Sequence, residues 1–145
     1  MSILINFIER LCELMQENNL NSKQLAQAVG ISQTSISKWM NNKKTVSLKH
    51  LLLLANYFNC SLDYLTGRSD DLLSFTPHSP ILFSQRIREI LQEQGSNRYR
   101  FVKQTRFTDT HFYRWDKGAV PQLATLEELA NLFDCSIDYL VGRER

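Results

Sequence analysis

The residues best suited to binding another molecule are polar side chains in one predicted helix. Four of them lie on the side of that helix opposite its apolar residues: Gln33, Thr34, Ser37 and Lys38. Amide and hydroxyl groups there can hydrogen-bond base edges in the DNA major groove, and a glutamine can bond adenine at two positions. Lys43 and Lys44 follow in the next loop, where ammonium groups suit phosphates.

The elements that must position these groups are a short helix, a tight turn and a second helix. We expect Ser22 to cap the first helix and Gly30 to end it. Ser32 is the expected cap of the second helix, and Ile31 and Ile36 point inward. This order is the helix-turn-helix plan, so the pattern predicts DNA recognition by the second helix.

No group of residues in the sequence indicates an enzyme. A phosphate-binding glycine loop, a nucleophile elbow and a metal-ligand spacing are all missing, so we predict no catalytic residue, no cofactor and no metal site. The three cysteines are far apart and are expected to be reduced thiols in core or half-buried positions. They are Cys12, Cys60 and Cys135.

The sequence repeats itself 75 positions further along. Residues 62–68, Leu-Asp-Tyr-Leu-Thr-Gly-Arg, recur at 137–143 as Ile-Asp-Tyr-Leu-Val-Gly-Arg, and Trp39 recurs as Trp115 after a shift of 76. Equivalent aromatic residues that end a helix are typical of a core, so both tryptophans are expected to be buried. The repetition predicts two similar domains in series.

Each copy is expected to contain five short helices, which makes the predicted fold class all-α. The first helix-turn-helix domain covers residues 1–68 and the second covers 83–145. Residues 69–82 are interpreted as a linker, because Pro77 and Pro80 break helices and favour extended backbone.

Signals for helix ends recur in both copies. Asn42 and Gly118 occupy equivalent places, and both residue types tolerate the left-handed backbone that ends a helix. Asp63 falls in the first turn of its own helix, where the helix dipole favours a carboxylate. The expected N-caps of later helices are Ser47, Ser61, Thr108 and Ser136.

Three motifs together resemble the Cro and phage-repressor family, also called the xenobiotic-response-element regulators. They are the Gln-x-Leu-Ala-x-x-x-Gly-Ile-Ser run from Gln24, the tryptophan that ends the third helix, and the Ser-x-Asp-Tyr-Leu-x-Gly ending. The resemblance covers both copies, nearly the whole chain. It implies that Gln24 contacts the DNA backbone or supports Gln33, and that Ser35 lies nearer a phosphate. The side chains implied to face bases are Gln33, Thr34 and Lys38, and those implied to lie along the DNA backbone are Lys43 and Lys44.

The second copy departs from this pattern. Arg100 stands in place of Gln24, and Arg106 stands in place of Gly30, so Arg106 would have to make the turn at some cost. Asp109 stands where a base or phosphate should be, and a carboxylate can accept from cytosine but repels a phosphate. The recognition positions of this copy are Asp109, Thr110, Tyr113 and Arg114, with His111 beside them.

Overall composition narrows the function little. The 145 residues carry a net charge of +2, which neither supports nor excludes nucleic-acid binding, because phosphate contact depends on local charge. The longest apolar run, residues 51–55, cannot span a bilayer, and the N-terminus shows no secretory signal. We therefore expect a cytoplasmic, nucleoid-associated protein without membrane contact.

Two functions from different classes remain open. The first is a sequence-specific regulator of transcription, a repressor, that binds double-stranded DNA. One chain would then imitate a two-fold dimer, or a homodimer would present four modules. The second is a protein-interaction or antitoxin-type regulator whose second domain binds a protein partner, with Asp109 at the contact. No small-molecule ligand is predicted, because the chain has no room for a separate ligand-sensing domain.

Overall fold

The computed structural model describes residues 3–71 and 82–143, and every regular element within them is a helix. This confirms the all-helical fold class. The predicted linker falls mostly on residues 72–81, outside the described residues. The N-terminal half contains α1 (Ile3–Glu17), α2 (Ser22–Val29), α3 (Gln33–Met40), α4 (Leu48–Phe58) and α5 (Leu62–Leu65). The C-terminal half contains α6 (Phe83–Glu93), α7 (Arg98–Gln104), α8 (Asp109–Asp116), α9 (Leu123–Phe133) and α10 (Ile137–Leu140).

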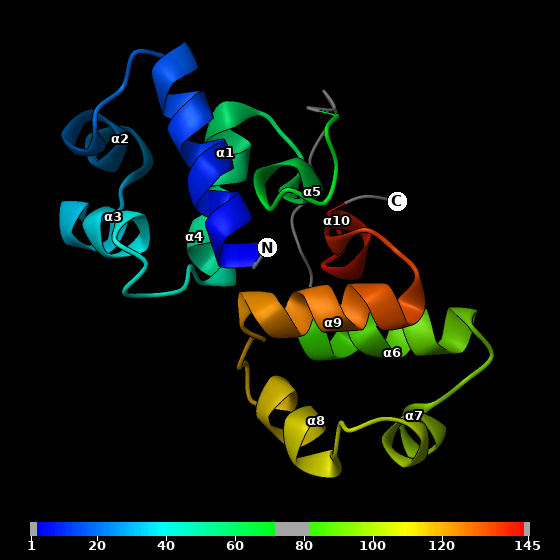
Figure 1. The fold of residues 1–145 in the computed structure, drawn as a ribbon. Helices are drawn as coiled ribbons and strands as arrows, with labels where there is room; N and C mark the ends of the chain where they lie inside the picture. Colours follow the sequence, from blue (N-terminus) through cyan, green and yellow to red (C-terminus); the bar gives the residue numbers. More distant parts are fainter. Residues whose placement is uncertain (1–2, 72–81, 144–145) are drawn as a thin grey trace.

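Most helices pack against others of the same half (Figure 1). In the N-terminal half α1 and α4 pack on α5, and α2 packs on α3 and α4. In the C-terminal half α6 packs on α7, α8 and α10, and α9 packs on α10. The halves meet where α1 lies against α9 and α5 lies against α10. Buried side chains from both halves belong to one hydrophobic core.

Side-chain caps explain where most of these helices begin. Ser47, Ser61 and Ser136 each accept the backbone N–H three residues later, as predicted. The prediction for α2 was wrong by one residue: its cap is Asn21, and Ser22 is the first residue of the helix. Asparagine and serine are equally good N-cap residues, so the local sequence does not separate them.

The helix-ending turns follow the predicted backbone in part. Asn42 and Gly118 both adopt positive φ, at 57° and 97°, as their equivalent positions predict. The prediction that Arg106 makes a strained turn is wrong. Here α7 ends at Thr105 in an extended conformation, and the Thr105 hydroxyl donates to the Phe101 carbonyl and accepts the N–H of Phe107. A hydroxyl thus replaces the missing glycine.

Both tryptophans are buried, as predicted, and each packs edge-on against a phenylalanine of the first helix of its half. The ring centroids of Phe7 and Trp39 are 5.8 Å apart, and those of Phe83 and Trp115 are 5.0 Å apart.

The predicted burial of the cysteines holds for two of the three. Cys60 is buried, Cys135 is half-buried, and burial raises the pKa of each thiol to about 11. Cys12 is exposed, contrary to the prediction, because its position on α1 faces solvent beside Met40.

The halves join through a reciprocal pair of carboxylates. Asp138 accepts the backbone N–H of Leu62 at 3.0 Å and that of Asp63 at 3.1 Å. Asp63 in turn accepts the N–H of Ile137 through both of its oxygens, at 3.0 and 3.1 Å. Each carboxylate therefore satisfies free donors at the start of the short helix in the other half. An interaction of Asp63 with the dipole of its own helix was predicted from the sequence, and this contact with the other half was not.

Arg68 connects Asp63, which lies in the same half, to residues of the opposite half. Its Nε donates to Asp63 at 3.0 Å. Its two terminal nitrogens donate to the Asn131 side-chain oxygen at 2.8 Å and to the Cys135 carbonyl at 3.2 Å. Burial raises the pKa of Asp63, and the charge of Asp138 raises it further, while the Ile137 N–H and Arg68 oppose that rise.

Arg143 makes the equivalent set of contacts in the other direction. It donates to Asp138 at 2.7 Å and to the Cys60 carbonyl and the Asn56 side-chain oxygen at 3.0 Å each. Asp63, Arg68, Asn131 and Cys135 thus have their counterparts in Asp138, Arg143, Asn56 and Cys60, so this junction between the halves is close to reciprocal.

Candidate nucleic-acid interface

The segment α2–turn–α3 positions the polar residues singled out in the sequence. Gly30 ends α2 with φ 73°, and its N–H donates to the Ala26 carbonyl. Ile31 and Ile36 are buried, as predicted, so the turn and α3 are anchored to the core. The opposite side of α3 is left facing solvent.

Four predicted base-reading residues lie on that solvent-facing side of α3. All of their side chains are exposed: Gln33, Thr34, Ser37 and Lys38. Ser32 caps the helix as predicted, accepting the Ser35 N–H at 3.1 Å, and the two hydroxyls lie 2.9 Å apart. Ser35 is half-buried by this contact and sits at the edge of the exposed group. The arrangement offers amide, hydroxyl and ammonium groups to an incoming polar surface.

Gln24 takes a local role in this structure. Its side-chain oxygen accepts the Asn21 N–H at 2.9 Å, and the Asn21 side chain accepts the Gln24 N–H at 2.8 Å. This capping box fixes the start of α2. The glutamine side chain remains exposed, so its amide nitrogen is accessible to solvent while its oxygen holds the cap.

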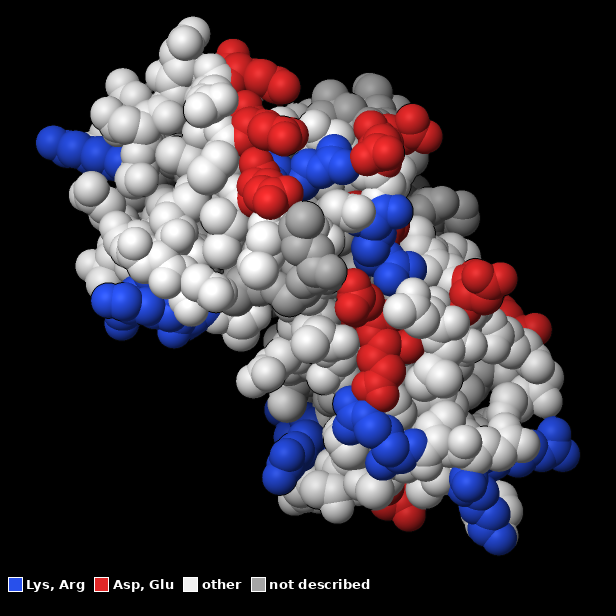
Figure 2. All heavy atoms as spheres, in the orientation of Figure 1, with Lys and Arg blue, Asp and Glu red and all other residues white. Residues whose placement is uncertain are grey.

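The loop after α3 carries the local positive charge. Lys43 and Lys44 are exposed there, and the Lys43 N–H donates to the Lys38 carbonyl at 2.8 Å. Burial lowers the pKa of the neighbouring His50, and the charges of Lys44 and Lys49 lower it further. Figure 2 shows lysines and arginines projecting at the margins beside the α3–α4 loop and beside α8, with acidic side chains over α1.

The equivalent helix of the C-terminal half, α8, has a different surface. Thr110, Tyr113 and Arg114 are exposed, and Tyr113 is 63% exposed. Asp109 is also exposed, but its carboxylate lies 3.5 Å from the Arg98 guanidinium. The Arg98 charge therefore offsets the negative charge of Asp109, at the position predicted to meet a base or a phosphate.

Two other basic residues of this half are engaged locally. Arg100 donates to the Gly95 carbonyl at 3.3 Å. Arg106 pairs with Glu128 at 2.6 Å, which lowers the pKa of that carboxylate. The Arg106 guanidinium is therefore paired within the half, and that of Arg100 is held against its own backbone.

His111 is half-buried against the rings of Phe107 and Trp115. Its Nδ1 accepts the Thr108 N–H at 3.0 Å, so it helps to cap α8. Only Nε2 then remains to reach a phosphate.

The two candidate reading helices both lie far from the junction of the halves. In Figure 1, α3 lies at the left edge and α8 at the lower edge, each away from α5 and α10. The reciprocal contact of Asp63 and Asp138 and the contact of α1 with α9 join the halves that carry α3 and α8. Sequence reasoning missed this junction, although the aspartate and arginine recurring at the end of both copies were a usable signal.

Two further features of the described residues bear on function, the length of their apolar helices and the grouping of potential metal ligands. No helix within residues 3–71 and 82–143 is long and apolar enough to cross a membrane. Across the same residues, no group of three or more potential ligands could hold a metal ion.

Comparison with known proteins identifies residues 13–65 as a match to the helix-turn-helix family model HTH_3. The chain is 32% identical over 65 residues to YobD of Bacillus subtilis, an uncharacterised HTH-type transcriptional regulator, covering 45% of this chain and 58% of the relative. It is 33% identical over 61 residues to BcrR of Enterococcus faecalis, an HTH-type transcriptional activator, covering 42% of this chain and 30% of the relative. The chain thus spans less than two thirds of either relative. No solved structure matches significantly. These similarities support a DNA-binding transcription regulator with a helix-turn-helix domain at residues 13–65.

Proposed function

We propose that the protein regulates transcription by binding a specific double-stranded DNA site, with α3 in the major groove. The observation that carries this proposal is the exposed polar side of α3, held by buried Ile31 and Ile36 inside the segment that matches the helix-turn-helix family. Side chains of this kind at the start of a recognition helix are suited to base edges.

Within this proposal the residues divide by the part of DNA that they contact. Gln33, Thr34 and Lys38 face bases, with Ser37 beside them. Ser35, the Gln24 amide nitrogen and the two loop lysines contact phosphates, because phosphate contacts hold a recognition helix in register. These loop lysines are Lys43 and Lys44.

Two substitutions distinguish a residue that contacts bases from a residue that contacts phosphates. Gln33→Ala should remove about 1–3 kcal/mol of discrimination at one base pair and leave the rest of the preferred sequence unchanged. Lys44→Ala should weaken all duplexes alike and lower the slope of log affinity against log salt by about 1. Lys23→Ala, on the exposed side of α2, is the matched control and should change neither quantity. Equal effects of Gln33→Ala on preferred and random duplexes would contradict base reading by this residue.

We further propose that residues 1–68 and 83–145 are two tandem domains, with 69–82 as their linker. The reciprocal hydrogen bonds of Asp63 and Asp138 support this division, because they make one chain the counterpart of a two-fold dimer. One chain would then place α3 and α8 in successive major grooves. Sedimentation of the DNA complex tests this: one chain per site supports it, and two chains per site favour a homodimer with four modules.

The direction of regulation that we propose is repression, because a tandem module that covers a stretch of duplex excludes other proteins from it. The relative BcrR is named as an activator, so the assay must be able to detect either a decrease or an increase in transcription. A reporter with the selected site overlapping a promoter should fall when the protein is expressed, and should recover with Gln33→Ala. A rise in the reporter would contradict repression while leaving DNA binding intact.

A second candidate function rests on α7 and α8. Tyr99 and Tyr113 are 66% and 63% exposed, and aromatic residues with one polar end are frequent in protein interfaces. The C-terminal half would then bind a protein partner instead of DNA, with Asp109 at the contact. Tyr113→Ala and Arg114→Ala distinguish the two: unchanged DNA affinity favours the partner role, and a loss of more than about threefold places α8 on DNA.

A further inference from the structure

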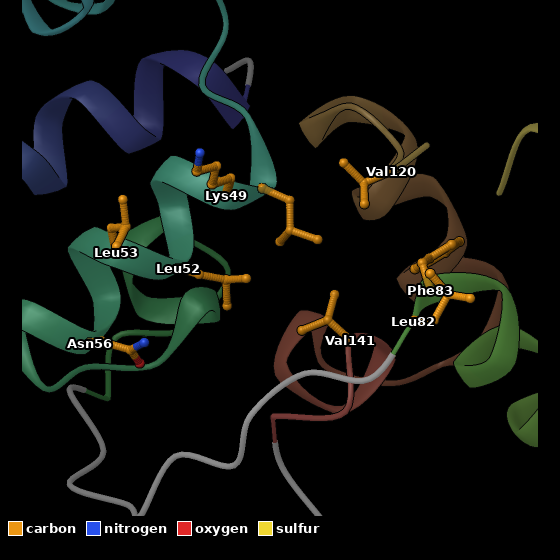
Figure 3. A pocket seen from close by; sticks show the side chains of 9 residues that line it. Lys49, Leu52, Leu53, Asn56, Leu82, Phe83, Val120 and Val141 are labelled. Carbon is orange, nitrogen blue, oxygen red and sulfur yellow. The ribbon is translucent and has the colours of Figure 1, made fainter. Parts of the chain in front are cut away.

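A cavity of about 470 Å³ opens between the two halves. Its wall on one side is α4, with Leu48, Leu52 and Leu53, and on the other side are Phe83 of α6 and Val141 after α10 (Figure 3). This volume falls in the range of about 300–1,000 Å³ that small-molecule sites have. The cavity arises only where the halves meet, so no separate ligand-sensing domain is needed to form it.

The rim of the cavity is apolar although solvent reaches it. Leu53, Leu82 and Val120 come from three separate segments and remain 38%, 51% and 48% exposed. Exposed apolar side chains that gather at one hollow are typical of a binding site, whereas isolated ones are ordinary surface.

The fold itself does not require an apolar lining at this place. In the C-terminal half, the equivalent side of α9 carries Glu127 and Glu128 where α4 carries Leu52 and Leu53. That side of α9 lines a more polar depression, although α9 forms the same kind of helix in the same position. Leu52 packs partly against the core, but the exposed Leu53 is not explained by helix formation or by core packing.

Two polar side chains line the cavity, those of Asn56 and Lys49, and each can donate a hydrogen bond. The Asn56 side-chain oxygen accepts from Arg143 at 3.0 Å, which leaves the amide nitrogen as its donor. Lys49 supplies an ammonium group at the rim and makes no ion pair in the described part of the chain. Lys49 and Asn56 lie at opposite ends of the α4 wall, so the positive charge of Lys49 is the group complementary to an apolar body that ends in a carboxylate.

We propose that this cavity binds a small amphiphilic carboxylate, with its aliphatic or aromatic body between α4 and the start of α6 and its carboxylate at Lys49 on the rim. Such a ligand contacts both halves at once, so its binding favours one relative orientation of the halves. The proposal concerns ligand binding alone and stands whether or not the protein binds DNA.

The direct test uses the full chain and anilinonaphthalene sulfonate, an apolar fluorophore with an anionic group. We expect saturable binding of one probe per chain and displacement by decanoate below its micelle concentration. Decylammonium, with the same chain and the opposite charge, should displace it at least tenfold less well. No saturable binding, or equal displacement by the two competitors, would overturn the proposal.

Variants assign the binding to this cavity. Leu52→Glu with Leu53→Glu installs the pair that α9 already carries, so the fold should persist by circular dichroism while probe affinity falls more than tenfold. Lys49→Ala should weaken decanoate about tenfold and leave decanol unchanged. Leu132→Glu, an exposed leucine on α9, is the matched control and should change neither. A folded double variant that binds the probe like the unaltered chain would refute the site.

Discussion

Removal of the Asp138 carboxylate is the sharpest perturbation of the contact between the halves. Its side chain is 2% exposed and accepts three hydrogen bonds, from the Leu62 and Asp63 backbones and from Arg143. Asp138→Ala leaves two backbone donors of the opposite half without an acceptor and takes one partner from a buried guanidinium.

The expected loss follows from these contacts. Each buried donor left unpaired costs about 1–3 kcal/mol, and breaking a buried ion pair costs about 3–5 kcal/mol. Arg143 keeps the Cys60 carbonyl and the Asn56 oxygen as acceptors, so these costs do not add in full. We expect Asp138→Ala to lower the free energy of unfolding by about 3–5 kcal/mol, a large part of the stability of a small protein.

Denaturant unfolding measures this loss, and amide hydrogen exchange locates it. Exchange should accelerate at Leu62 and Asp63, in the half that does not carry the substitution. Asp109→Ala is the matched control, because that aspartate is 74% exposed and its ion pair contributes at most about 1 kcal/mol. A loss for Asp138→Ala no larger than that of the control, with unchanged exchange at Leu62, would refute the reasoning.

The remaining predictions concern the turn after α2 and His50 in the first turn of α4. Gly30→Ala should lower the free energy of unfolding by about 1–2 kcal/mol in thermal unfolding, because φ is 73° and an added Cβ would meet nothing within 4 Å, so strain alone acts. An unchanged stability would contradict that backbone assignment. The lowered pKa of His50 means that the unfolded chain binds its proton more readily, so stability should rise with pH between about 5 and 7. His50→Gln should flatten that rise, and an unaltered pH profile would show that His50 is not responsible.

Local features of the fold could be predicted because local chemistry determines them. Serines at helix starts, the left-handed positions at Asn42 and Gly118, and the buried tryptophans all follow from residue type and repeat position. The exposed side of α3 follows from the buried positions of Ile31 and Ile36. The cap of α2 was missed by one residue because Asn21 and Ser22 are equivalent in propensity.

Features that depend on distant residues could not be predicted in this way. Asp63 has a sufficient local explanation at its own helix, so its hydrogen bond with Ile137, 74 positions away, was not predicted, although the recurrence of the aspartate and arginine in both copies was a signal for it. The Thr105 turn replaces a glycine by a hydroxyl contact that spacing rules do not describe. The cavity beside Leu52 exists only because the halves meet at one particular angle, which no helical pattern specifies.

Selection of bound duplexes from a random pool at moderate salt tests the central claim most directly. We expect one enriched motif whose two half-sites are separated by about one helical turn or a multiple of it, with the C-terminal half contributing the weaker preference. Gln33→Ala should alter one position of the stronger half-site. Binding of the selected pool no tighter than that of random DNA would contradict the proposed function.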